Sequence, residues 1–289
     1  MDTNFYDRMS LSTNKSEMVH IASDAGYSVL DLGCGRGEVC CAISRELAGV
    51  QIIHGVDAVV TEFASVKDAV FGLTVLPEFF TMDILEFLRK TPHKYDCIIM
   101  SAVLHELNAQ ELAELHKLLP RVMSAHCTLL IREPLIPKDE RKLWLDLGGF
   151  STLFCSDIVT NDRKAMEYLH CSKLSSQEVP ITVNLLNYAF VRAYGPNSWE
   201  REKHQYRFAY TLPFMKRWAK SCFGRNLRHP VHTYYYRYKD CSYHNHFENA
   251  GIPDKVFDSV AYTSGLLVVT NNELVARHLH SDKEITYTI

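Results

Sequence analysis

The sequence lacks the features of a membrane-spanning, secreted or metal-scaffold protein. No stretch approaches the roughly 18 uninterrupted apolar residues that a transmembrane helix needs, and no basic segment at the N-terminus leads into an apolar one. The nine cysteines are an odd number with no C-x-x-C pair, which argues against a disulfide scaffold or a zinc cluster. We therefore expect a cytoplasmic, reducing environment, with no membrane association and no metal.

The composition is that of a globular protein able to bury a sizeable core. Of 289 residues, 47% are hydrophobic and 22% are charged, which excludes a disordered or fibrous chain. The net charge of −3 hides an asymmetry, because residues 199–239 hold ten Lys and Arg against two acids. That segment carries +8 and the remainder −11, and the same segment holds eleven aromatic residues. A basic, aromatic segment on an acidic body suggests an anionic partner.

Short apolar runs alternate with helical spacing over residues 28–135. This alternation predicts parallel strands joined by right-handed crossovers, which is the α/β doubly wound class. Asn108 and Glu111 form the sequence signature of a capping box at the start of one helix. The expected strands are 28–32, 51–56, 78–84, 95–104 and 128–131, and the expected helices are 38–47, 61–70 and one from 108 to about 120.

The alternation of strands and helices stops after residue 135. It resumes near residue 240 with a helix ending at 250–251 and strands at 256–262 and 266–269. We therefore predict one α/β domain, built from residues 28–135 and 231–275, that is interrupted by a mainly helical insertion over residues 136–230. We expect this insertion to be a substrate-covering element over the carboxyl ends of the strands. Residues 1–27 would form an N-terminal lid segment, in which Tyr6 is the candidate contact, and residues 276–289 a C-terminal tail.

The segment from Asp31 to Glu38 carries the chemistry. A strand runs into a turn with glycines at 33, 35 and 37 and then into a helix, which directs backbone N–H groups at a ligand. A dinucleotide site uses G-x-G-x-x-G, whereas here the third position of that pattern is Glu38. The carboxylate of Asp31 would repel a pyrophosphate but attract an ammonium or a sulfonium. The pattern favours S-adenosylmethionine.

On these residues the sequence resembles the class I S-adenosylmethionine-dependent methyltransferases. The resemblance covers about residues 28–135 and more weakly 240–270, and it implies a seven-stranded sheet with an antiparallel last strand. It also implies residues that contact the cofactor's methionine end, its ribose and its adenine. Further contacts are implied at the end of the fourth strand. The implied residues are Asp31, Gly33, Cys34, Gly35 and Gly37 (methionine), Asp57 and Ala58 (ribose), Met82, Asp83 and Ile84 (adenine), and Ser101 and Ala102.

The catalytic candidates follow the fourth and fifth strands, where the acceptor must approach. His105 is suited to remove a proton from a hydroxyl or an ammonium, since imidazole titrates near neutrality. Glu106 is beside it, and Arg132 and Glu133 close the fifth strand. These residues also have non-catalytic interpretations: His105 as a packed histidine, and the charged residues as halves of surface ion pairs.

The sequence is compatible with more than one class of methyl acceptor. A small molecule methylated on oxygen or nitrogen is preferred, and RNA, including its cap, is the second candidate through residues 199–239. Two further hypotheses are a catalytically inactive cofactor-binding protein and a nicotinamide-dependent oxidoreductase. Binding of S-adenosylhomocysteine or of NAD separates the cofactors, and a product assay tests turnover. The sequence gives no oligomeric state.

Overall fold

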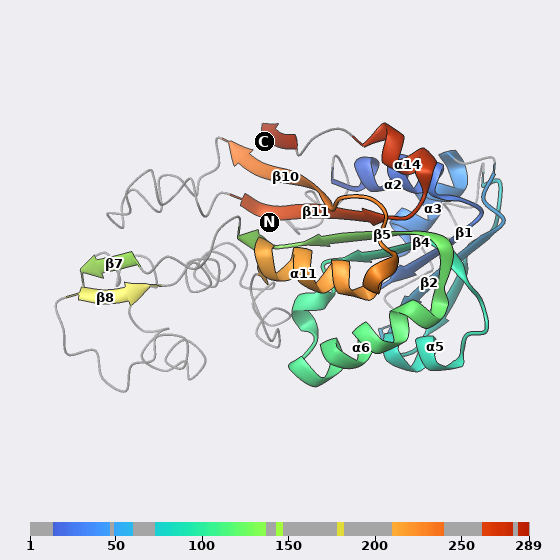
Figure 1. The fold of residues 1–289 in the computed structure, drawn as a ribbon, viewed down its shortest axis with the longest axis horizontal. Helices are drawn as coiled ribbons and strands as arrows, with labels where there is room; N and C mark the ends of the chain where they lie inside the picture. Colours follow the sequence, from blue (N-terminus) through green and yellow to red (C-terminus); the bar gives the residue numbers. More distant parts are fainter. Residues whose placement is uncertain are drawn as a thin grey trace, which may run out of the picture.

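The computed structural model describes residues 14–46, 49–59, 73–136, 143–146, 178–181, 210–239, 262–279 and 283–288. Its main feature is a mixed sheet covered by helices on both faces (Figure 1). Helices α5, α6 and α11 cover one face, and α2, α3 and α14 cover the other. Within the described parts of the chain, no helix is both long and apolar enough to cross a membrane.

The helices and strands have the following bounds. The α-helices are α2 (Asn14–Ala25), α3 (Glu38–Glu46), α5 (Ile84–Lys90), α6 (Ala109–Val122), α11 (Leu212–Cys222) and α14 (Glu273–His278), with 3₁₀ turns η1 (Leu104–Glu106) and η2 (Gly224–Asn226). The strands are β1 (Ser28–Leu32), β2 (Ile52–Asp57), β3 (Glu78–Thr81), β4 (Tyr95–Ser101), β5 (Met123–Glu133), β6 (Leu135–Ile136), β7 (Leu143–Asp146), β8 (Glu178–Ile181), β9 (Tyr210–Thr211), β10 (His232–Lys239), β11 (Tyr262–Thr270) and β12 (Lys283–Thr288).

The main sheet has the order β12-β10-β11-β5-β4-β1-β2-β3. Strands β1 to β5 pair in parallel, and β11 is antiparallel to both β5 and β10. Seven of these strands reproduce the expected doubly wound sheet with an antiparallel strand near its edge, so the predicted fold class is confirmed. An eighth strand, β12, extends the sheet by pairing in parallel with β10, where the sequence predicted a C-terminal tail.

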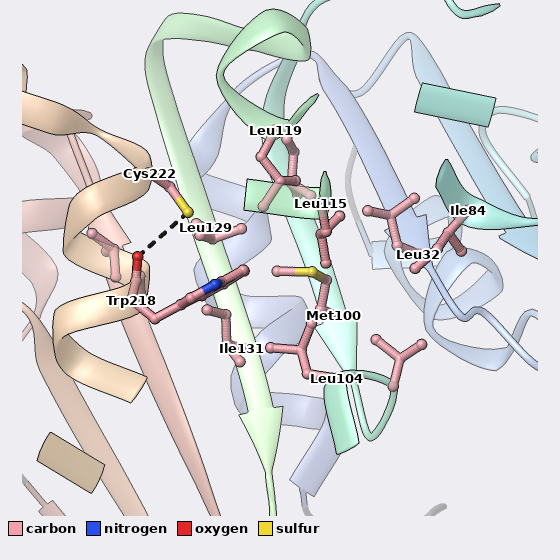
Figure 2. Close-up of a cluster of buried hydrophobic side chains, with 14 of the residues drawn as sticks. Leu32, Ile84, Met100, Leu104, Leu115, Leu119, Leu129, Ile131, Trp218 and Cys222 are labelled. Carbon is pink, nitrogen blue, oxygen red and sulfur yellow. Dashed lines mark hydrogen bonds between the residues drawn. The ribbon is translucent and has the colours of Figure 1, made fainter. Parts of the chain in front are cut away.

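Two apolar clusters fill the layers on either side of the sheet. The larger lies beneath α5, α6 and α11, and Figure 2 shows Leu129, Ile131 and Trp218 meeting there with leucines of α6. The smaller lies beneath α2, α3 and α14. The central strand β4 is buried on both faces, as its continuous apolar run predicts for a parallel strand covered on both sides. Strand residues are buried in both clusters, and this packing fixes the positions of the strand ends that form the candidate site.

Local sequence signals explain where most elements begin. The capping box at Asn108 is present, because its side chain accepts from the Glu111 backbone while the Glu111 side chain accepts from the Asn108 N–H. The expected strand over 78–84 is shorter, since β3 ends at Thr81 and α5 begins at Ile84. The expected helix at 61–70 lies outside the described residues.

The sixth strand differs from the prediction. That place in the sheet belongs to β10, residues 232–239, and not to residues 256–262. The tyrosine-rich run of β10 has strong strand propensity, which its basic residues obscured. Residues 240–261, including the helix expected to end at 250–251, lie outside the described part of the chain.

A short parallel pairing brings residues 135–136 beside residues 210–211. Leu135 and Ile136 of β6 pair in parallel with Tyr210 and Thr211 of β9, so residues 137–209 form an excursion whose two ends meet beside the end of β5. Helix α11 follows at once and buries five side chains in the larger cluster. Although the sequence assigned residues 212–222 to the insertion, this helix is a layer of the main domain.

The N-terminal helix is also part of the core. In α2, Met18, Val19, Ala22 and Ala25 are buried in the smaller cluster. Residues 14–25 of the expected lid segment therefore pack on the sheet. Tyr6, the candidate lid contact, lies outside the described residues.

Candidate functional site

The glycine turn joins the end of β1 to the start of α3 and is tied to β2. The N–H groups of Gly33 and Cys34 both donate to the Val56 carbonyl, at 2.8 and 3.1 Å, and Gly37 N–H donates to Cys34 O at 2.9 Å. The turn therefore has a fixed shape without any ligand. The N-terminus of α3 follows it directly, and such a terminus favours a negatively charged or electron-rich group.

The structural reason for a glycine differs among the three positions of the turn. All have positive φ, which a side chain rarely allows. A Cβ at Gly33 would lie 2.7 Å from the Val103 side chain, and one at Gly37 would lie 2.5 Å from the ring of Phe79. A Cβ at Gly35 would meet nothing within 4 Å. Close packing thus accounts for two of the glycines, while Gly35 faces open space.

Asp31 lies inside the turn with only 2% of its surface exposed. Its Oδ2 accepts a weak hydrogen bond from Cys40 Sγ at 3.6 Å. Burial, and then the charge of Asp31, hold the pKa of Cys40 well above its usual value; the same two causes raise the pKa of Cys34. Both thiols therefore stay protonated at neutral pH and do not act as nucleophiles.

Asp57 ends β2 and connects it to the glycine turn. Its Oδ2 accepts from Gly35 N–H at 2.9 Å and its Oδ1 from Val59 N–H at 3.0 Å. A carboxylate has about four lone-pair positions, so these two bonds leave acceptor capacity for a pair of hydroxyls. Ala58, the next residue, is exposed.

The expected adenine-contact residues around Asp83 have a structural role that the sequence did not suggest. Asp83 is the N-cap of α5, and its Oδ1 accepts from Leu85 N–H at 2.9 Å and from Glu86 N–H at 3.0 Å. Ile84 is buried in the larger cluster, and Met82 packs against it. Asp83 itself is exposed, so its side chain can cap the helix and still meet a ligand.

The end of β4 has a strained backbone. Ala102 has φ 58° and is the one non-glycine residue of the described segments with positive φ. Its N–H donates to Arg132 O at 2.7 Å, which holds it in place. A non-glycine residue in this conformation costs about 1–2 kcal/mol, and such strain gathers at ligand sites. Ser101 and Ala102 therefore lie where the sequence placed them, with Ala102 exposed.

His105 and Glu133 form a buried pair beside that strand end. His105 Nδ1 lies 2.6 Å from Glu133 Oε2, and the other carboxylate oxygen accepts from the N–H groups of Val103 and Leu104 at 2.8 and 2.6 Å. The exposed fractions of His105 and Glu133 are 5% and 0%. Because Glu133 accepts at Nδ1, the neutral ring carries its lone pair on Nε2.

Neighbouring residues on β5 point to opposite faces, and this separates two candidates that the sequence put on one rim. Glu133 points into the layer of α6 and α11 and binds His105. Arg132 remains partly exposed, and its Nη1 donates to Ser101 Oγ at 3.3 Å. Glu106 is exposed at the end of η1. A period-two reading of β5 would have separated Arg132 from Glu133 beforehand.

Tyr210 is a residue that the sequence analysis missed. Its hydroxyl donates to Leu104 O at 2.8 Å, and its N–H donates to Pro134 O at 3.0 Å. The returning end of the excursion is thus bonded to the turn that carries His105. No local signal could reveal this contact, because more than 100 residues separate Tyr210 from Leu104.

Arg228 of the 199–239 segment lies away from this site, whereas Arg237 of β10 is near its edge, because Tyr235 is paired with Gly265 and Gly265 with Glu133. Arg228 N–H donates to Asn271 Oδ1 at 3.0 Å, and Asn271 N–H donates to Cys127 O at 3.1 Å. Cys127 is near the beginning of β5, about 20 Å from Glu133 at the strand's other end. Arg228 therefore does not cover the carboxyl ends of the strands, contrary to our expectation for this segment. The histidines at 229 and 232 belong to no cluster of metal-ligating side chains within the described ranges.

Comparison with known proteins identifies the domain. Residues 29–125, which include β1, the glycine turn, β4 and the His105 turn, match the sequence model described as "Methyltransferase domain". With the sheet order above, this match defines a class I S-adenosylmethionine-dependent methyltransferase domain. Nothing among curated protein sequences matches the chain.

Solved structures resemble the chain only remotely. The plantazolicin methyltransferase BpumL, in complex with a pentazolic desmethylPZN analog and SAH, has 13% identity and a TM-score of 0.45, with 92% of this chain and 89% of that one covered. An Archaeoglobus fulgidus SAM-dependent methyltransferase has 13% identity and a TM-score of 0.48, with 93% and 100% covered. A Burkholderia thailandensis O-methyltransferase family protein has 15% identity and a TM-score of 0.46, with 89% and 56% covered. Similarity this remote says nothing about the acceptor.

Proposed function

We propose that this methyltransferase transfers the methyl group to an oxygen or nitrogen atom of a small molecule, with His105 as the general base. The observation that carries the proposal is the buried His105–Glu133 pair, which follows β4 beside the strained Ser101–Ala102 backbone. The cofactor supplies an activated methyl group. The protein must then align the acceptor and, for a hydroxyl or an ammonium, accept its proton.

The proposed cofactor site is the edge of the sheet where β1, β2, β3 and β4 end. Open space at Gly35, the spare acceptor capacity of Asp57 and the buried charge of Asp31 all support it. The residues proposed to line it are Asp31, Gly33, Cys34, Gly35, Gly37, Asp57, Ala58, Met82, Asp83, Ile84, Ser101 and Ala102. Ile84 would contribute through its backbone, because its side chain is in the core.

The pair with Glu133 supports the assignment of His105 as a base. A carboxylate that accepts from Nδ1 fixes the orientation of the ring and stabilises the imidazolium that forms when Nε2 takes a proton. Glu133 has 0% exposure, so it acts as a positioning residue. The exposed Glu106 and the partly exposed Arg132 are proposed to meet the acceptor.

The location of Arg228 and the negative charge of the rest of the chain support a small acceptor over RNA. An RNA held near the site would need phosphate contacts around the carboxyl ends of the strands. Arg228 lies at the opposite edge, and the body outside the 199–239 segment carries −11, which would repel a long polyanion. Small-molecule transfer is therefore the preferred reading.

The test of His105 uses release of S-adenosylhomocysteine from S-adenosylmethionine over a panel of phenols, carboxylic acids and amines. With an acceptor found in that panel, His105→Asn should lower turnover about 100-fold or more and abolish the acidic limb of the pH–rate profile. Its affinity for S-adenosylhomocysteine should stay unchanged. An unaltered rate would remove His105 from the mechanism.

The test of RNA as the acceptor is binding to short capped and uncapped RNA at increasing salt. Phosphate contacts would make the affinity fall steeply with salt, and Arg225→Glu with Arg228→Glu would weaken it. We expect no binding at physiological salt. Tight, salt-sensitive binding that these variants abolish would replace the small-molecule proposal. If the panel also gives no product, the hypothesis of an inactive cofactor-binding protein stands.

A further inference from the structure

Among the residues that the structure describes, Arg132 at the end of β5 has no acidic partner. Its Nη1 donates to Ser101 Oγ at 3.3 Å, while its Nε is buried and has no hydrogen-bond partner. Among the described residues no acid forms an ion pair with it. Leaving a buried donor unsatisfied is costly, and more so for a charged group. An anion that completes this arrangement is the simplest account of it.

The sheet register places Arg132 on the same face as Asp31. Arg132 is paired with Ser101 of β4 and with Leu266 of β11, and Leu266 belongs to the cluster beneath α2, α3 and α14. Asp31 contacts Cys40 of α3 on that face and is paired with Ile99 of β4, two residues before Ser101. A negative and a positive side chain therefore lie two strands apart at the same edge.

A carboxylate is the anion that this position suits. The planar guanidinium offers parallel N–H groups that match two carboxylate oxygens, and Ser101 already holds one of its nitrogens. At about 4.8 Å per strand, Asp31 and Arg132 are separated by a span that an α-amino acid can bridge, with its ammonium toward Asp31 and its carboxylate toward Arg132.

We propose that Arg132 is a carboxylate-binding residue of the active site. The proposal rests on the cofactor placement given under Proposed function. The carboxylate has two sources with the same chemistry. It belongs to the methionine end of the cofactor, or to an acceptor bound beside it at the ends of β4 and β5.

Calorimetry with two ligands separates the sources. S-Adenosylhomocysteine has the carboxylate, and its decarboxylated analogue, S-adenosyl-3-thiopropylamine, lacks it. If the cofactor is the source, Arg132→Gln weakens binding of the first ligand about 10- to 100-fold, as the loss of a charge-assisted hydrogen bond predicts, and leaves the second unchanged. Arg132→Lys, which keeps the charge without the fork, should lie between.

If the acceptor is the source, S-adenosylhomocysteine binds the variant as it binds the wild type. Benzoate, added to the complex with S-adenosylhomocysteine, should then raise the melting temperature of the wild type but not of Arg132→Gln, and benzamide should raise neither. Arg89→Gln is the matched control, because Arg89 is an exposed arginine paired with Glu114 on the surface. Its ligand binding should equal that of the wild type.

The outcomes are separable. If neither the cofactor's affinity nor the benzoate response depends on Arg132, the carboxylate assignment is wrong while the cofactor placement stands. If the wild type itself fails to bind S-adenosylhomocysteine, the cofactor placement fails. Circular dichroism of Arg132→Gln shows whether the variant is folded, and Arg132→Lys provides the comparison if it is not.

Discussion

Asp57 shapes the glycine turn and lies where we propose that the ribose binds. Its two oxygens hold the N–H groups of Gly35 and Val59, so the carboxylate shapes the glycine turn before any ligand arrives. Its removal should affect both the free protein and the complex.

We predict that Asp57→Ala lowers the affinity for S-adenosylhomocysteine by about 1–3 kcal/mol, because ribose hydroxyls lose their acceptor. The unliganded protein should also melt at a lower temperature, since two backbone N–H groups lose a partner. Calorimetric titration and thermal unfolding measure the two effects. Glu114→Gln, at an exposed surface acid, is the control. Unchanged cofactor affinity in Asp57→Ala would contradict the proposed ribose contact.

The sequence predicted the positions of residues in the fold best where the pattern is local. Asp31, the three glycines and Asp57 lie at neighbouring strand ends, as their motif spacing implied. The partner of His105 was not predictable in the same way. From the sequence, Glu133 was expected at the exposed end of the fifth strand. The structure shows that it is buried and accepts from the Leu104 N–H of η1, while the Tyr210 hydroxyl donates to the Leu104 carbonyl.

At the scale of elements, α5 begins at Asp83, a helix cap that we also propose as a cofactor contact. The sequence read residues 78–84 as one strand because aromatic and aliphatic residues run through them. The chain instead turns at Asp83, whose side chain accepts from two N–H groups of α5. A seven-residue helix has little intrinsic stability, so its cap matters.

We predict that Asp83→Ala lowers the free energy of unfolding by about 0.5–2 kcal/mol, the usual cost of losing an N-cap. Asp83→Ser should restore most of that stability, because serine also caps. If Asp83 contacts adenine as well, Asp83→Ser will still bind S-adenosylhomocysteine more weakly than the wild type. Urea unfolding and calorimetry on the same two variants separate the roles. Full recovery of both properties in Asp83→Ser would assign Asp83 to the cap alone.

The strands β2, β3 and β4 meet α5 around His54. Its Nδ1 lies 2.8 Å from Tyr95 Oη, its Nε2 lies 3.5 Å from Glu78, and Phe80 and Phe87 pack edge-on against its ring. Burial, partly offset by Glu78 and reinforced by His93, lowers the pKa of His54 below its ordinary value of 6.5. The folded protein therefore binds this proton less readily than the unfolded chain does.

We predict that stability falls as the pH drops below 6.5, because the unfolded state then takes up a proton that folded His54 resists. Above that pH the contribution is fully present. His54→Gln, which keeps a hydrogen-bonding group near Tyr95, should show a shallower loss over the same range. Urea unfolding at a series of pH values measures the slopes. Parallel curves for the two proteins would exclude His54 as the source.

At the scale of the whole molecule, alternation of strands and helices was sufficient to predict the doubly wound sheet. It failed after β5, where sequence neighbours stop being neighbours in the sheet. Strand β10 lies outside β11 although it precedes it, and β12 returns to pair with β10. Which strands pair in this part of the sheet depends on which strand edges are still unpaired. A short stretch of sequence does not carry that information.

The pairing of β6 with β9 makes the excursion removable in principle. We predict that replacing residues 137–209 by a flexible linker of about eight residues leaves a folded domain that binds S-adenosylhomocysteine. Helix α11, which keeps its place in the core, would still follow β9. Circular dichroism and calorimetry on the shortened protein test this. A shortened protein that does not fold would show that the core depends on the excursion.

The same pairing has a consequence for how such a protein changes over generations. Once Leu135 and Tyr210 are held side by side, the chain between them closes a loop, and its entropic cost grows only with the logarithm of its length. Doubling such a loop costs about 0.6 kcal/mol, a small fraction of a domain's stability. Insertions and deletions between these two residues are thus nearly neutral for folding, so selection can lengthen, shorten or replace this segment while the sheet beneath it stays the same.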